Sequence, residues 1–193
     1  MKGEIEAILR RAIEVHSSLT SQIPAIERVT THLAEVFSKG GTVYVMGNGG
    51  SAADSQHLAA ELVGRFLMER DPLPCHALTT DASTMTSLAN DLGYDMVFAK
   101  QVEAFVHAKD AVIAISTSGR SANVIEGIKA AKRCDALTIA LTGGDGGELA
   151  RLCDMAIIVP STETPRIQEA HGTIIHILCY LIEETLFGAT KAD

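Results

Sequence analysis

Residues 42–65 read Thr-Val-Tyr-Val-Met-Gly-Asn-Gly-Gly-Ser-Ala-Ala-Asp-Ser-Gln-His-Leu-Ala-Ala-Glu-Leu-Val-Gly-Arg. The stretch begins with β-branched and apolar residues, continues with glycines and ends in an alanine-rich pattern. This order predicts a strand over 42–46, a tight turn over 47–51 and then a helix. Glycines let several backbone N–H groups converge beside the positive N-terminus of a helix. We therefore expect the turn to hold an oxyanion or a sugar hydroxyl.

Two nucleotide-binding patterns are not favoured by this turn. A P-loop requires Gly-Lys followed by Ser or Thr, and the chain contains no Gly-Lys dipeptide. The dinucleotide fingerprint requires another glycine three residues after Gly49, where Ala52 stands.

The expected helix carries His57 and Glu61, which are four residues apart and so share one helical face. Two metal ligands or an acid–base pair need this spacing. A solvated surface pair has the same spacing and is the alternative. The position of the pair, one to three turns after a glycine turn, favours a functional role.

A second strand-and-turn unit repeats this design. An almost uniformly apolar strand is expected over 110–115, and Ser-Thr-Ser-Gly-Arg-Ser follows it before a helical segment over 122–132. The four hydroxyls of this turn and its N–H groups can surround a phosphate without a lysine. The alternative is a turn that merely caps its helix, for which one hydroxyl suffices.

The whole chain fits one α/β domain of 193 residues. Further strands are expected over 75–79, 136–141 and 155–159, and their alternation with helices predicts a doubly wound, five-stranded parallel sheet between two helical layers. Ligands then gather at the carboxyl edge of the sheet, where both turns lie. The glycine-rich stretch 142–147 is interpreted as an ordinary turn between a strand and a helix.

Composition excludes several classes of function. A net charge of −8 argues against nucleic-acid binding, and no apolar run has the length of a membrane span. The charged amino terminus does not resemble a signal peptide, so a cytoplasmic location is expected. The four cysteines have no metal or redox spacing and are expected to be small core residues.

Helices are expected at both ends of the domain. Two amphipathic helices within residues 1–41 carry wide apolar stripes, which we expect to lie partly at a subunit interface. A long helix from 164 or 165 to 187 is apolar almost all round and should be buried, and residues 188–193 should fray. The first half of this helix nevertheless holds four polar residues that suggest a site: Gln168, Glu169, His171 and His176.

Five motifs together resemble the sugar-isomerase (SIS) domain family. They are Gly-Asn-Gly-Gly-Ser-Ala-Ala-Asp-Ser-Gln-His, Ala-Asn-Asp, Ile-Ser-Thr-Ser-Gly-Arg-Ser, Leu-Thr-Gly-Gly-Asp-Gly-Gly and Arg-Ile-Gln-Glu-Ala-His. The resemblance spans nearly the whole chain and implies a flavodoxin-like fold and a homotetramer with sites at subunit interfaces. It is strongest to the branch that isomerises sedoheptulose 7-phosphate to D-glycero-D-manno-heptose 7-phosphate through an enediol, for heptose precursor biosynthesis.

The resemblance also implies roles for single residues. Glu61 and His176 would be the acid–base pair. A divalent metal, zinc in that family, would be bound by His57, Glu61, Gln168 and His176. Asn90 and Asp91 would hold sugar hydroxyls, Ser116, Thr117, Ser118 and Ser121 the phosphate, and Arg65 would support the substrate or the Glu61 carboxylate. The remaining substrate contacts would be Asn48, Gly49, Gly50, Ser51, Glu61 and Gln168.

Gln168 and His176 pose a geometric problem as ligands of one metal. Eight residues of a regular helix separate them by roughly 12 Å along the axis and about 80° around it. Either Gln168 lies on an irregular helix start, or a neighbouring subunit supplies one ligand. Two other functions stay open: a non-catalytic SIS scaffold that binds the replication initiator, and an SIS isomerase for another sugar phosphate. The filled ligand positions favour the heptose isomerase.

Overall fold

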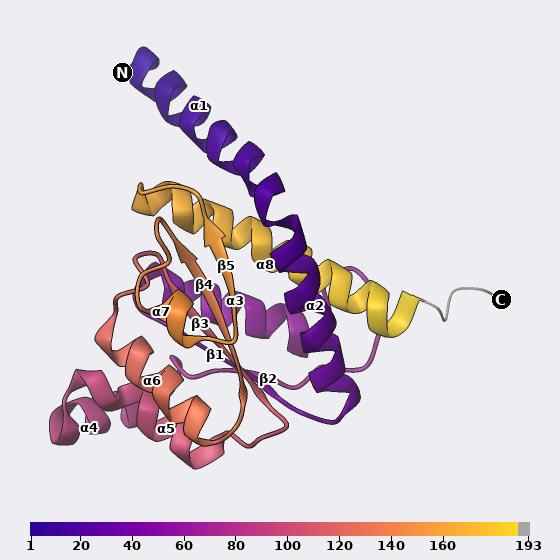
Figure 1. Ribbon diagram of the computed structural model, residues 1–193, viewed down its shortest axis with the longest axis vertical. Coiled ribbons are helices and arrows are strands. Elements are labelled where there is room, and N and C mark those ends of the chain that lie inside the picture. Colours follow the sequence, from indigo (N-terminus) through magenta and orange to yellow (C-terminus); the bar gives the residue numbers. More distant parts are fainter. Residues whose placement is uncertain (189–193) are drawn as a thin grey trace.

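The computed structural model describes residues 1–188, so most of the tail that was expected to fray lies outside the described residues. A five-stranded sheet in the order β2-β1-β3-β4-β5 forms the middle layer, and all its strands are parallel (Figure 1). This confirms the predicted doubly wound sheet. The strands are β1 Val43–Gly47, β2 Cys75–Ala77, β3 Ala111–Ser116, β4 Leu137–Gly143 and β5 Met155–Val159.

The strand β3 shows why the sheet needs two helical layers. All six of its residues are buried. Ile113 and Ile115 belong to one core cluster, whereas Val112 and Ala114 belong to the other, because successive side chains of a strand point to opposite faces. The first cluster is completed by α2 (Ile23–Ser38), α3 (Gly50–Val63) and α8 (Thr164–Phe187), and the second by α5 (Val97–Phe105) and α6 (Ala122–Arg133).

Shorter elements connect these layers. They are the 3-10 turns η1 (Leu19–Gln22) and η2 (Tyr94–Met96), and the helices α4 (Ala82–Leu92) and α7 (Leu149–Leu152). Asp81 caps α4 by accepting a hydrogen bond from the backbone N–H of Thr84. Within residues 1–188 no helix combines the length and the apolar character that a membrane span requires.

The two N-terminal helices differ in how they meet the domain. Helix α2 buries Ile26, Val29 and Leu33 in the core, whereas α1 (Lys2–Ser18) has no buried residue among those described. Figure 1 shows α1 extending away from the sheet and its covering helices. The exposed side chains of α1 include Ile5, Ile8, Leu9 and Ile13.

The glycine turn after β1 has the backbone that its sequence predicts. Gly49 has a φ of +56°, a conformation that residues with a side chain rarely adopt. The carbonyl of Asn48 accepts from the N–H of Ser51, and the carbonyl of Gly49 accepts from Ala52 and Ala53. The helix α3 therefore begins at Gly50, directly at the carboxyl end of β1.

Candidate active site

Three side chains from two helices meet beside the sheet. The Nε2 atom of His57 lies 3.2 Å from Glu61 Oε1 and 3.2 Å from His176 Nε2. One potential ligand atom of each residue lies within 4.8 Å of those of the other two. The rings of His57 and His176 are nearly perpendicular, with centroids 4.9 Å apart. We refer to His57, Glu61 and His176 as the three-residue cluster.

Hydrophobic packing of α3 against α8 brings the cluster together. Leu58 and Leu62, each one position after a cluster residue, are buried on the core face of α3. Ile175 is likewise buried on α8, directly before His176. Because these apolar neighbours fix the rotation of both helices, His57 and Glu61 are left half-buried and His176 exposed, with their polar ends toward one another.

The geometry of the cluster fits a divalent metal. Zinc bonds of 2.0–2.1 Å in a tetrahedral arrangement place neighbouring ligand atoms about 3.3 Å apart, close to both separations of 3.2 Å. Two imidazole nitrogens at such a distance need a proton or a cation between them, since their lone pairs otherwise repel. Two nitrogens and one carboxylate oxygen suit zinc and also other divalent ions.

A buried ion pair between Arg70 and Glu183 supports the cluster, and the sequence did not predict it. The carboxylate of Glu183 on α8 accepts hydrogen bonds from the backbone N–H groups of Phe66, Leu67 and Met68 and from Arg70 Nε. Burial would raise the pKa of Glu183, but these donors together lower it below its ordinary value.

The ion pair is also linked to Glu61 and His176 of the cluster. Arg70 donates a hydrogen bond to the carbonyl of Glu61. The ring of Phe66, in the segment that Glu183 holds, lies 5.3 Å from that of His176. Glu183 and Arg70 are 113 residues apart, so no local pattern in the sequence indicates the pair.

Gln168 lies on a regular part of α8, about two turns before His176. The helix is α-helical from Thr164 through Phe187, so the proposed irregular start is wrong. The amide of Gln168 lies against the backbone of Gly50, where a Cβ atom would overlap it. Burial raises the pKa of Asp54 above its ordinary value, and the nearby side chains of Gln168 and His57 offset part of this effect. In a single chain, Gln168 therefore faces the start of α3.

Two other polar residues of α8 have structural partners. His171 is fully buried, its Nε2 atom is 3.2 Å from the carbonyl oxygen of Thr142, and burial lowers its pKa to about 4. Glu169 pairs with Arg166 at 2.7 Å. The histidine is therefore a neutral core residue at neutral pH, and the sequence signal for a site belongs to Gln168 and His176.

The hydroxyl turn follows β3 at the carboxyl edge of the sheet, as predicted. Ser116 is buried and its Oγ atom is 3.1 Å from Ser121 Oγ. Thr117 and Ser118 border a hollow of about 450 Å³, whose other walls include Gly144 and Ser161. The hollow is large enough for a phosphate group, and its polar walls come from the ends of three strands.

The glycine-rich stretch 142–147 does more than connect a strand to a helix. Arg120 Nη2 of the hydroxyl turn pairs with Asp145 at 2.6 Å, and the Leu149 N–H donates to the carbonyl of Gly119. Arg120, with the backbone N–H of Gly147, lowers the pKa of Asp145 to about 2. The stretch therefore braces the hydroxyl turn.

The remaining predicted substrate residues fall into two groups. Asn48 and Gly49 form the turn between β1 and α3, and Gly50 and Ser51 begin α3; all four lie beside the hydroxyl turn because β1 and β3 are adjacent. Asn90 and Asp91 lie exposed at the end of α4 and hydrogen-bond to each other. Arg65 is exposed and pairs with Glu69, so in this geometry it does not support the Glu61 carboxylate.

Comparison with known proteins identifies the family. Residues 7–143, well over half of the chain, match the family described as SIS domain. The chain belongs to the SIS domain family. The matched residues include β1 to β4, the glycine turn after β1 and the hydroxyl turn after β3.

Relatives within the family are named phosphoheptose isomerase. One from Pelobacter propionicus is 54% identical over 165 residues, covering 86% of this chain and 87% of its own. Another, from Citrifermentans bemidjiense, is 49% identical and covers 99% of this chain and 100% of its own. The solved structure of the phosphoheptose isomerase from Neisseria gonorrhoeae superposes with a TM-score of 0.90 at 40% identity, covering 95% of this chain and 98% of its own. The chain therefore groups with the phosphoheptose isomerases.

Proposed function

We propose that this isomerase converts sedoheptulose 7-phosphate to D-glycero-D-manno-heptose 7-phosphate through an enediol, with the help of a divalent metal, in heptose precursor biosynthesis. The observation that carries the proposal is the three-residue cluster, which lies in a chain about half identical to phosphoheptose isomerases. The relatives supply the substrate class, and the cluster supplies groups suited to proton transfer.

Isomerisation of a ketose to an aldose moves a proton between two adjacent carbons. It needs a base, an acid and stabilisation of the oxyanion that develops on the sugar. The carboxylate of Glu61 can accept the proton at an Oε atom, and His176 can hold or return a proton at Nε2. These two groups share His57 as a neighbour at 3.2 Å, which places them around one small volume.

The metal would be held by His57, Glu61 and His176, with zinc the expected ion. When bound, a divalent cation acts as a Lewis acid toward the sugar oxygens. Three protein ligands are typical of catalytic zinc sites, which keep one position open. Gln168 is the predicted fourth ligand; its amide lies against Gly50 of its own chain, and a neighbouring copy is the proposed alternative source of this ligand.

The other end of the substrate would lie in the hydroxyl turn. Ser116, Thr117, Ser118 and Ser121 offer hydroxyls at the N-terminus of α6, where a phosphate is favoured by the helix dipole. Arg120 is tied to Asp145, so we assign the phosphate to hydroxyl and backbone N–H donors. Asn90 and Asp91 are proposed to hold sugar hydroxyls from their exposed position on α4.

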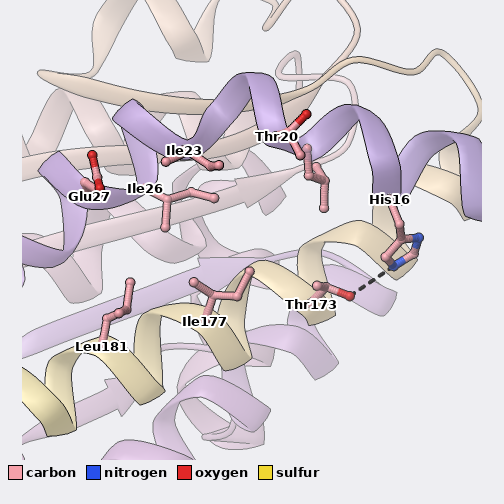
Figure 2. A pocket seen from close by; sticks show the side chains of 9 residues that line it. His16, Thr20, Ile23, Ile26, Glu27, Thr173, Ile177 and Leu181 are labelled. Atoms are coloured by element: carbon pink, nitrogen blue, oxygen red, sulfur yellow. Dashed lines mark hydrogen bonds between the residues drawn. The ribbon is translucent and has the colours of Figure 1, made fainter.

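We further propose a homotetramer with sites at its subunit interfaces. Helix α1 presents an apolar face, and an apolar groove of about 400 Å³ lies between the N-terminal helices and α8 (Figure 2). His16 and Thr173 close one end of this groove with a separation of 3.0 Å between Nε2 and Oγ1. Burial of such surfaces against other copies would stabilise the assembly.

The proposed substrate also favours a cytoplasmic location, because charged sugar phosphates do not cross membranes unaided. The two alternatives predict different results. An SIS isomerase for another sugar phosphate would convert a pentose or hexose phosphate faster than the heptose phosphate. A non-catalytic scaffold would convert none of them, although the cluster is unnecessary for such a role.

The direct test is to incubate the purified chain with sedoheptulose 7-phosphate and follow the aldose by nuclear magnetic resonance. Appearance of the heptose 7-phosphate supports the proposal. Absence of the aldose from zinc-supplied protein would contradict it. Parallel reactions with fructose 6-phosphate and ribulose 5-phosphate distinguish the other sugar-phosphate branches.

A further inference from the structure

Asn48 in the glycine turn is paired with a buried residue that the motifs do not assign. Its Nδ2 atom donates to Asn123 Oδ1 at 2.8 Å, and Asn123 Nδ2 donates back to Asn48 Oδ1 at 2.8 Å. Asn123 lies in the first turn of α6 and is 3% exposed. The two amides thus form a reciprocal pair between the turn after β1 and the helix after β3.

Two further contacts determine which atom of each side-chain amide is the oxygen and which is the nitrogen. The backbone N–H of Val124 donates to Asn123 Oδ1 at 3.0 Å. A backbone N–H can only donate, so this atom of Asn123 must be the oxygen and the other the nitrogen. The oxygen of Asn48 must then face Asn123 Nδ2. Tyr94 OH, at 3.1 Å from the same oxygen of Asn48, must donate its proton to it.

This network leaves Asn48 with a single unused hydrogen-bonding group. Its oxygen accepts from Asn123 and Tyr94, which occupies both lone pairs. Its nitrogen has two hydrogens, of which Asn123 takes one. One N–H of Asn48 therefore remains, and the side chain can act toward a ligand only as a donor.

We propose that Asn123 is a positioning residue that holds Asn48 as a one-hydrogen donor to an acceptor oxygen of the sugar phosphate. This inference rests on the proposed function, since it assigns a partner to a residue of that site. A carbonyl, an enediolate oxygen or a hydroxyl lone pair satisfies the donor, whereas a group that can only donate does not. Tyr94, from η2, completes the orientation of Asn48 by occupying the second lone pair.

Asn123→Asp tests the orientation with little risk to folding. The aspartate still accepts from Val124, and its charge is favourable at a helix N-terminus. The aspartate cannot donate to Asn48 Oδ1, because its second carboxylate oxygen takes the place of the Asn123 amide nitrogen. Ala122→Asp is the matched control, because residue 122 is exposed in the same turn of α6. Both variants place a carboxylate near the proposed phosphate, so their difference reports the contact with Asn48, and we expect kcat/KM to fall about tenfold further in Asn123→Asp than in Ala122→Asp.

A double-mutant cycle separates positioning from a merely structural role. If Asn123 acts through Asn48, Asn123→Ala lowers kcat/KM in the wild-type background and has no further effect in Asn48→Ala. Additive losses in the double variant, or wild-type kcat/KM in Asn123→Asp, would overturn the proposal.

A readout without substrate keeps this test independent of the proposed function. The side-chain amide signals of Asn48, assigned through their loss in Asn48→Ala, should shift in Asn123→Asp and Tyr94→Phe but not in Ala122→Asp. Unchanged Asn48 signals in Asn123→Asp would contradict the positioning role even if the enzyme acts on another sugar. Shifted signals in a protein that does not convert sedoheptulose 7-phosphate would leave the orientation intact and overturn the proposed substrate alone.

Discussion

His57 and His176 bring their Nε2 atoms to 3.2 Å from each other although 119 residues separate them along the chain. One lies on α3 and the other on α8, two helices packed on the same face of the sheet. Burial of apolar neighbours on both helices places the two imidazoles edge to face, where a proton or a divalent cation between the two nitrogens would prevent repulsion of their lone pairs.

Removal of one imidazole should therefore weaken binding of the proposed metal. We expect His57→Ala to lose bound zinc and with it most of the isomerase activity, because two ligands hold a divalent ion far more weakly than three. Metal content per chain, measured by mass spectrometry after dialysis, checks this. His32→Ala is the control, since His32 is exposed and its ring bonds only to its own helix. Equal zinc in both variants would exclude His57 as a ligand.

The hydroxyl turn should govern substrate affinity more than turnover. Changing Ser116, Thr117 and Ser118 together to alanine removes hydrogen bonds to a charged phosphate, which are worth about 1.5–3 kcal/mol each. We expect KM to rise by at least about tenfold, with a smaller change in kcat. Steady-state kinetics measure both constants. Ser21→Ala serves as a control, because Ser21 lies on η1 and its hydroxyl donates to the carbonyl of Ser18 at the end of α1. An unaltered KM in the triple variant would rule out the phosphate site.

The buried carboxylate of Glu183 should contribute stability that depends on pH. Its folded-state pKa is lowered by three backbone donors and Arg70, which outweigh the effect of burial. The contribution is therefore fully present above the pKa of an unfolded glutamate, about 4.3, and is lost as the pH falls through the lower folded-state value.

We expect Glu183→Gln to lower the free energy of unfolding by about 3 kcal/mol at pH 7 and by less at pH 3.5. Urea unfolding at one protein concentration measures this at both pH values. Glu184→Gln is the matched control, since residue 184 is exposed on the same helix. A loss for Glu183→Gln that does not change between the two pH values would contradict the assigned titration.

The apolar face of α1 should hold the subunits together. Leu9→Glu combined with Ile13→Glu places two charges among exposed apolar side chains and should shift the proposed tetramer toward smaller species. Light scattering after gel filtration measures the mass. Glu14→Lys changes the charge on the other face of α1 and should leave the mass unchanged. A tetramer that survives the double variant would show that this face is not the interface.

Local sequence patterns predicted much of the fold. All five strands follow from short apolar runs, and each observed strand lies within about two residues of its prediction. Local patterns predicted only part of the three-residue cluster. His57 and Glu61 show helical spacing, but His176 joins them through tertiary packing, and only the resemblance to a family indicated it.

Other parts of the site had no local signal at all. Asn123 and Asn48 are 75 residues apart; Asn48 lies in the glycine turn that the sequence singles out, but no local pattern pairs it with Asn123. The contact of Arg120 with Asp145 likewise joins two turns that follow adjacent strands. Strand order, which the periodicity of the sequence does not specify, brings these residues together. The bracing role of 142–147 was therefore missed.

The most direct test of the central claim compares the wild-type chain with Glu61→Gln in the conversion of sedoheptulose 7-phosphate. Glutamine keeps the shape of the side chain but cannot accept the proton, so a loss of kcat of at least about a hundredfold is expected. Glu69→Gln, at an exposed glutamate in the segment that follows α3, should behave as wild type. The account predicts aldose formation by wild type and Glu69→Gln alone; near-full turnover by Glu61→Gln would contradict it.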